Sequence, residues 1–247
     1  MNLDQLKIQV LEYFSDLKFD PELHKYAVEG KPLKYSVSGI IKKYSNPFDA
    51  DKIAPYSAKK AGVSVQEIKA QWKSANRLSL EIGNAAHDFG ELHALDRSIV
   101  PMDGYQEAIA NFWASLPEEL ELVFVELRMY HKGVWYAGTM DIFLYNKISG
   151  NFIIADYKTN KDLFKNHKGQ MLRGKFSDLL DNPFNKYQIQ LNYYQELIEQ
   201  IPGINVSQRK VIWVKPDGTF EVLDCENFQD RIKERQTKTK RRWHYDK

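Results

Sequence analysis

The sequence predicts an α/β protein in which one mixed β-sheet lies between helices. Three strand-like runs follow each other closely, at about 120–131, 134–146 and 151–158, and a fourth lies at 209–214. Apolar residues at helical spacing come before the first three runs, and others separate those runs from the fourth. Strands in succession, followed by a helix and a further strand, are typical of a mixed sheet covered by helices.

Residues 1–74 are expected to form a hairpin and helices that lead into this core. The hairpin is expected within 20–40, from strands at 25–28 and 35–38 and a turn that contains Gly30. Two short helices are expected within 51–74, the second of them near Ser64, because a capping residue there is followed by Glu67.

The pattern from about 74 to 95 is strongly helical and has two unusual faces. One face carries apolar residues, namely Leu78, Ile82, Ala85, Phe89 and Leu92. The other carries His87 between Gly83 and Gly90. Glycine inside a helix costs roughly 1 kcal/mol relative to alanine. Two glycines therefore indicate that another backbone or a ligand comes close, and we expect this helix to be packed on both sides.

The remaining elements complete a single domain. Helices are expected at 105–116 and around 187–201, the latter marked by Tyr187, Leu191 and Tyr194 at helical spacing. A turn at 216–218 is followed by an expected basic C-terminal helix. We divide the domain into N-terminal elements at 1–74, a catalytic core at 75–214 and a basic extension at 215–247.

The composition excludes several classes of protein. A hydrophobic content of 43% and a charged content of 28% are typical of a globular protein, and no apolar run is long enough to cross a membrane. The first residues lack the pattern of a secretion signal, so we expect a cytoplasmic location in a bacterium or a phage-infected host. The single cysteine, Cys225, excludes a disulfide within the chain and a four-cysteine cluster.

Basic residues gather in two zones, although the net charge is only +2. Residues 231–247 carry eight Lys and Arg against two acids. A second cluster follows the third strand, at Lys158, Lys161, Lys165, Lys168, Arg173 and Lys175. Both zones suit a polyanion partner. From charge alone, a solvated helix end and a solvated loop remain the simpler interpretation.

Acidic residues interrupt two of the predicted central strands. Asp156 and Lys158 end the apolar run 152–155, and strand periodicity puts their side chains on one face. Asp141 lies within an apolar part of the preceding strand. Because unpaired buried charges are costly, two carboxylates with a lysine indicate a site for a hard cation such as Mg²⁺ or Mn²⁺. An edge-strand ion pair and a strand-end carboxylate are the alternatives for each residue alone, but their joint occurrence favours a site.

Four motifs resemble the PD-(D/E)XK nuclease superfamily and its RecB-like branch, and they follow one another along the chain in the order expected of that branch. Gly138-x-x-Asp141 and Asp156-x-Lys158 resemble the superfamily motif. Gly83-x-x-x-His87-x-x-x-Glu91 and Gln190-Leu191-x-x-Tyr194 resemble two helix motifs of the branch. The resemblance covers roughly residues 36–214 and is to phage and mitochondrial-type exonucleases. It implies a restriction-endonuclease-like fold, and Cys225 alone implies that no iron–sulfur cluster is present.

The resemblance also implies roles for individual residues. Asp141 and Asp156 would bind the metal, helped by His87 and the carbonyl of Tyr157, while Lys158 would orient or deprotonate the attacking water. Gln190 would position Lys158 or a phosphate, with Tyr194 packing behind it, and Glu91 would orient His87 or assist a second metal. Glu126 is an outer partner or an exposed strand residue. The candidate DNA-binding residues are Lys161, Lys165, Lys168, Arg173 and Tyr194, with Trp243 and Tyr245 as further aromatics in the tail.

The function expected from this resemblance is Mg²⁺- or Mn²⁺-dependent hydrolysis of DNA from its ends, in recombination, repair or phage DNA processing. A structure-specific or nicking endonuclease and a catalytically silent nucleic-acid-binding module remain as alternatives. The pair His87-Asp88 also suggests an HD-type phosphohydrolase, but the other candidate acids lie on predicted strands rather than helices. Strand preference, cleavage polarity and oligomeric state stay open.

Overall fold

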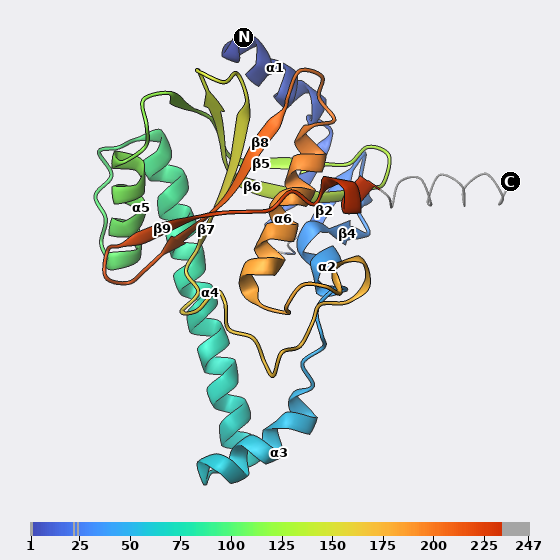
Figure 1. The fold of residues 1–247 in the computed structure, drawn as a ribbon, viewed down its shortest axis with the longest axis vertical. Coiled ribbons are helices and arrows are strands. Elements are labelled where there is room, and N and C mark those ends of the chain that lie inside the picture. Colours follow the sequence, from blue (N-terminus) through green and yellow to red (C-terminus); the bar gives the residue numbers. More distant parts are fainter. Residues whose placement is uncertain (1, 22, 24, 234–247) are drawn as a thin grey trace, which may run out of the picture.

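A mixed six-stranded sheet forms the centre of the protein, as Figure 1 shows. The computed structural model describes residues 2–21, 23 and 25–233. The sheet has the order β4-β6-β7-β8-β9, and β5 pairs with β6. Its strands are β4 (Tyr35–Ser36), β5 (Leu120–Tyr130), β6 (Tyr136–Asn146), β7 (Phe152–Lys158), β8 (Val206–Val214) and β9 (Phe220–Asp224). The β4/β6 and β7/β8 pairs are parallel and the other pairs are antiparallel.

Helices cover both faces of the sheet, which confirms the predicted α/β class. One face packs against α1 (Leu3–Tyr13), α2 (Val37–Lys42) and α6 (Pro183–Ile198). The other packs against α5 (Gly104–Ala114) and the C-terminal part of α4 (Val65–Leu95). Side chains of β7 alternate between the two cores, as expected of a buried central strand. Every helix of the described chain is too short or too polar to cross a lipid bilayer.

Strand β6 changes its neighbour along its length. It pairs with β4 at Tyr136 and Ala137, and with β7 only from Ile142 to Tyr145. Residues 138–141 therefore lie at a gap between β4 and β7 on that side of β6. Backbone and side-chain polar groups at this gap are available for bonds other than those of the sheet.

Helix α4 is one continuous helix of 31 residues, not a short helix followed by another. It begins at Ser64, where a capping box with Glu67 forms as the sequence suggests. It runs through 74 because neither proline nor glycine occurs between 66 and 82. The predicted apolar face was wrong: Leu78 and Leu92 are exposed. The buried side follows the small residues instead, through Ala86, Gly90 and Ala94 with Phe89 and His93.

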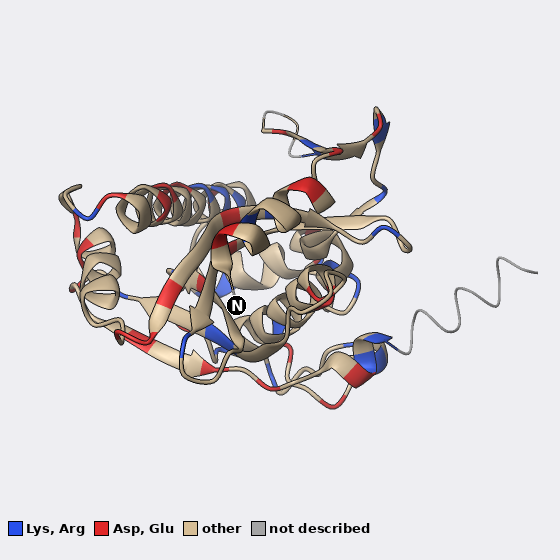
Figure 2. Cartoon of the chain, turned by 90° about the horizontal axis from the view of Figure 1, so that it is seen from above, with Lys and Arg blue, Asp and Glu red and all other residues tan. Residues whose placement is uncertain are grey.

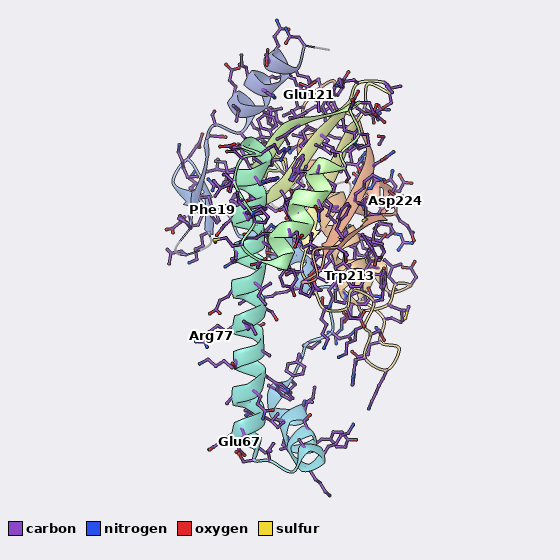
Figure 3. The ribbon with its side chains drawn as sticks, turned by 90° about the vertical axis from the view of Figure 1, so that its left-hand side faces the viewer. Phe19, Glu67, Arg77, Glu121, Trp213 and Asp224 are labelled. Atoms are coloured by element: carbon purple, nitrogen blue, oxygen red, sulfur yellow. The ribbon has the colours of Figure 1, made fainter. Side chains whose placement is uncertain are left out.

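The first half of α4 projects from the body, so this helix is not packed on two sides throughout. Helix α3 (Ala50–Ala61) packs against its beginning through Ala54, Ala58 and Ile68. Between that contact and the body, residues 73–81 are all exposed. Figures 1 and 3 show this arm extending beyond the sheet, with Arg77 on its bare stretch.

The N-terminal hairpin differs from its prediction in the identity of its second strand. A small antiparallel sheet forms from β1 (Leu17–Asp20), β2 (Lys25–Val28) and β3 (Lys31–Pro32). Glu29 and Gly30 both have positive φ, which gives a tight two-residue turn, so the chain pairs again at once from Lys31. Tyr35 and Ser36 are then free to pair with β6 as β4.

The C-terminal region is part of the core up to the end of the described residues. Strand β9, which the sequence analysis missed, pairs with β8, and Phe228 and Ile232 are buried in the main core. Asn192 of α6 donates to the carbonyl of Glu226 and accepts the N–H of Phe228, which holds this segment on α6. Figure 2 shows basic residues at the end of the described chain. The expected basic helix beyond 233, with Trp243 and Tyr245, lies outside it.

The two glycines of α4 are expected to respond oppositely to substitution by alanine. A Cβ at Gly90 would lie 2.6 Å from Cε2 of the buried Tyr157 ring, whereas at Gly83 the nearest atom is Thr159 Oγ1 at 3.8 Å. Gly83→Ala should raise the free energy of unfolding by about 1 kcal/mol through helix propensity. Gly90→Ala should lower it by about 1–3 kcal/mol through overpacking. Urea denaturation of both variants measures the difference, and an equal rise in both would refute the tight contact.

Candidate metal centre

The candidate site lies at the gap beside β6. The last printed pair of β6 and β7 is Ile142 with Ala155, so extending the register by one residue puts Asp141 opposite Asp156. The backbone N–H of Tyr157 donates to Asp141 Oδ2 at 3.1 Å, where a strand partner would otherwise accept. The divergence of the strands therefore brings the two predicted carboxylates together, on neighbouring strands and on one face.

Helix α4 supplies the histidine of this group. His87 Nδ1 lies 3.0 Å from Asp141 Oδ2. The helix comes this near to β7 because Gly90, one turn after His87, leaves room for the Tyr157 ring. The glycine pattern of the sequence thus marked a real close approach, and the approaching group is an aromatic side chain.

Glu126 of β5 joins the same group, which the sequence analysis left undecided. The pairs on either side of it, Val125 with Ile142 and Leu127 with Met140, put Glu126 beside Asp141. One ligand atom each of His87, Glu126 and Asp141 lies within 4.8 Å of the others. Glu126 also has a φ of 48°, which is rare for a residue other than glycine in a strand and marks local strain. The only signal in the sequence was one acid within an otherwise apolar strand.

Asp156 and Lys158 form a buried ion pair next to this group. Lys158 Nζ lies 2.6 Å from Asp156 Oδ2, and the Asp156 side chain is fully buried. The other carboxylate oxygen, Oδ1, is buried without a hydrogen-bond donor within the described chain. A buried carboxylate oxygen without a partner is costly, so this position favours a cation or a water that a cation holds.

The charges of the cluster shift one another's pKa values. Burial raises the pKa of Glu126, and the charge of Asp141 adds to it, giving about 7. Burial lowers the pKa of His87, but the Asp141 carboxylate outweighs burial and raises that pKa to about 9. Burial and the Asp141 charge likewise raise the pKa of Asp156. The cluster thus crowds three carboxylates against two basic groups, so it attracts a further positive charge.

Helix α6 carries Gln190 and Tyr194, whose side chains are hydrogen-bonded to each other. Gln190 Nε2 donates to Tyr194 Oη at 2.7 Å. Tyr194 is only 5% exposed and packs where a Cβ on Gly138 would lie 2.6 Å from its ring. Tyr194 is therefore largely buried, and its exposed edge lines a small pocket beside Gly138 rather than the cleft at His87. Its interior position explains why the motif of β6 contains a glycine.

The other predicted residues lie at differing distances from the cluster. Glu91 is exposed and influences Glu126 only through its charge. Lys161 lines a cleft of about 510 Å³ between α4 and the end of β7, and His87 and Lys158 line the same cleft. Lys165 and Lys168 are exposed on the loop beyond it. The last of the predicted DNA-binding residues of this loop, Arg173, donates from Nε to Asn46 Oδ1.

Comparisons with known proteins give no family. No family model matches the sequence, and the search of curated proteins gives no match. Among the solved structures that are similar is "Crystal structure of SSO0001", at 14% sequence identity with a TM-score of 0.35, over 94% of this chain and 81% of that chain. A likeness at this level carries no functional argument, so the chemistry rests on the geometry of the site.

The metal-free protein is expected to lose stability as the pH rises from about 5 to 9. Both Glu126 and His87 have pKa values raised above their usual 4.5 and 6.5, so the folded chain holds protons that the unfolded chain has released. The contribution of His87 is complete below pH 6.5 and is lost as the pH rises through about 9. The melting temperature in a chelator should fall by several degrees between pH 6 and pH 9. Glu126→Gln should make the melting temperature fall less with pH in the range below pH 7. A melting temperature independent of pH would contradict the charge interactions inferred for the cluster.

Proposed function

We propose that this protein is a Mg²⁺- or Mn²⁺-dependent nuclease that hydrolyses DNA phosphodiester bonds, acting from an end. The observation that carries the proposal is the convergence of His87, Glu126 and Asp141 beside the Asp156–Lys158 pair. Motifs that are far apart in the sequence and resemble one nuclease branch meet at this one place.

The donor set fits a hard divalent ion. Carboxylate oxygens are the ligands that Mg²⁺ and Mn²⁺ prefer, and one imidazole is compatible with Mn²⁺. Glu126 and Asp141 supply carboxylates, His87 supplies the imidazole, and the unpaired Oδ1 of Asp156 is available to a ligand or a water. When bound, such an ion lowers the pKa of a coordinated water and offsets negative charge on the phosphate.

The residues of the chain then have distinct tasks. His87 and Lys158 line one cleft, so a phosphodiester lying there meets both. The ammonium group of Lys158, held by Asp156, orients the attacking water and offsets charge in the transition state. The Tyr157 N–H keeps the Asp141 carboxylate directed toward the gap in the sheet.

Action on ends is the least direct part of the proposal, because it follows from the motif resemblance. An endonuclease and a catalytically silent binding module remain the alternatives. An HD-type phosphohydrolase would use Asp88 as a second metal ligand beside His87. Asp88 is exposed, and the possible ligands grouped with His87 are Glu126 and Asp141. The buried Oδ1 of Asp156, which no donor of the described chain satisfies, supports a bound cation and so favours catalysis over silent binding.

Metal binding is expected to depend on Asp141. Calorimetric titration with Mn²⁺ should show binding to the wild type and an affinity at least about tenfold weaker for Asp141→Asn. Asp88→Asn is the matched control, because it removes an exposed acid next to His87 and should leave the affinity unchanged. If the wild type bound no Mn²⁺, or if Asp141→Asn and Asp88→Asn bound it equally well, the proposed metal centre would be refuted.

Cleavage is expected to depend on Lys158. In Mg²⁺, the wild type should degrade end-labelled linear DNA and leave closed circles largely intact. Lys158→Ala should lower the rate by about 10²–10⁴-fold while Mn²⁺ binding and DNA binding persist. Lys147→Ala, an exposed lysine in the turn between β6 and β7, is the control. Unchanged turnover in Lys158→Ala would overturn the site assignment, and rapid nicking of circles would favour an endonuclease.

A further inference from the structure

A tyrosine ring lies over the ammonium group of the candidate catalytic lysine. Lys158 is the last residue of β7, at the point where the loop 159–182 begins. Its Nζ pairs with Asp156 Oδ2 at 2.6 Å. The same Nζ lies 4.6 Å from the centre of the ring of Tyr187, a residue of α6. We propose that Tyr187 is a positioning residue, whose ring holds the ammonium group of Lys158 against Asp156 and so fixes its place in the cleft.

The surroundings of Lys158 make the ring an effective restraint. The face of an aromatic ring attracts an ammonium group that lies within about 6 Å of the ring centre, and the attraction is largest where water is excluded. Only 12% of the Lys158 side chain is exposed. A lysine side chain is long and flexible, so a single contact at its end leaves it several orientations. The ion pair with Asp156 is one such contact, and the Tyr187 ring adds a second.

The Tyr187 ring is itself held in place by its neighbours. Its Oη donates to Asn160 Oδ1 at 2.8 Å, and Trp213 Nε1 donates to the Asn160 carbonyl at 2.7 Å. Trp213 is the residue of β8 that lies opposite Lys158 in the sheet register. Figure 3 shows Trp213 on the sheet side of the molecule, across from α4. Helix α6, the loop after β7 and strand β8 thus converge on one ring, which gives the lysine a fixed support.

Tyr187 differs in its contacts from the motif residues of the same helix. Gln190 and Tyr194 are hydrogen-bonded to each other, and Tyr194 is buried. Tyr187 is half-buried and lines the cleft together with Lys158. Its hydroxyl is already bonded to Asn160, so the part of Tyr187 that faces the lysine is the ring. This arrangement suits a side chain that orients another group.

Positioning affects a different step of the reaction from substrate contact. This inference rests on the proposed function, in which the Lys158 ammonium group orients the attacking water. A group displaced by about 1 Å can lower the rate by about 10²-fold. A ring that positions the lysine therefore affects kcat, whereas a ring that stacks on the substrate affects substrate binding and KM.

The test compares variants that keep the ring with variants that remove it. Tyr187→Phe loses only the hydroxyl, whereas Tyr187→Leu removes the ring. Tyr105→Leu is the matched control, because Tyr105 of α5 lines the same cleft and only Tyr187 of the two lies over Lys158. A further variant carries pentafluorophenylalanine at position 187, which keeps the shape of the ring but no longer attracts a cation. It carries the test if Tyr187→Leu folds poorly. The rate constants kcat and KM are measured in Mg²⁺ on end-labelled linear DNA, and Mn²⁺ affinity and melting temperature are recorded for each variant.

Positioning by the ring predicts a loss in kcat alone. Tyr187→Leu and the pentafluoro variant should lower kcat at least about tenfold and leave KM within about twofold, while Tyr187→Phe and Tyr105→Leu stay within about threefold of the wild type. In a Lys158→Ala background, Tyr187→Leu should have no further effect, because the ring acts through the lysine. Wild-type kcat in the variants without an attracting ring, a rise in KM alone, or a full further loss in the Lys158→Ala background would overturn the proposal.

A measurement that needs no cleavage separates this inference from the proposed nuclease. In protein with ¹³C-labelled lysine, the Lys158 signal is identified by its loss in Lys158→Ala. A ring above the lysine shifts its ε-proton resonance upfield, so Tyr187→Phe should keep the shift and Tyr187→Leu should remove it. If the wild type cleaves nothing but shows this pattern, the nuclease fails and the positioning contact stands. If the wild type cleaves DNA but Tyr187→Leu changes neither kcat nor the resonance, the positioning role fails and the nuclease stands.

Discussion

The change of partner along β6 is the constraint on which the rest of the site depends. Because β4 occupies the start of the strand and β7 only its later part, a short stretch between them lacks a strand on that side. Asp141 ends that stretch and takes a backbone N–H from Tyr157 in place of a sheet hydrogen bond. In a continuous sheet the Tyr157 N–H would donate to a backbone carbonyl of β6, and the carboxylate would lose this donor. The gap therefore gives an acidic cluster a buried position next to a cleft that His87 and Lys158 line.

Packing around the gap explains why small residues recur in the motifs. Gly138 leaves room for Tyr194 on one side of the sheet, and Gly90 leaves room for Tyr157 on the other. Both tyrosines are buried and fill space next to the cluster, which keeps its carboxylates out of bulk water. Burial raises the interaction energy of the charges, so each group shifts the pKa values of its neighbours. The glycines thus act through packing and electrostatics together, without touching a ligand themselves.

The projecting arm of α4 is anchored only at its two ends. Helix α4 is packed at its beginning by α3 and at its end by the sheet, and it is bare in between. Tertiary packing supplies most of the stability of a helix, so a bare stretch is maintained only because both ends are anchored. This stretch is an ordered, exposed surface, part of which lines the cleft beside the cluster. Binding to a preformed surface costs less conformational entropy than binding that must order a loop.

Local pattern alone predicted the α/β class, the three successive strands and the capped start at Ser64, because these depend on periodicity and capping. Polar residues in apolar runs marked Asp141, Asp156 and Lys158 as candidates, and the motif resemblance added His87. The sequence did not show that α4 buries its glycine side, because an exposed leucine and a buried one give the same pattern. The sequence patterns did not predict β9 or the pairing of Tyr35–Ser36 with β6. The reason is that each strand could pair with several strands that are distant in the sequence. Only the tertiary structure decided that Glu126 joins the cluster and that Tyr194 packs against Gly138. A strand's own pattern does not say which residue of another strand lies beside it, since sheet register is set between segments that are distant in the chain.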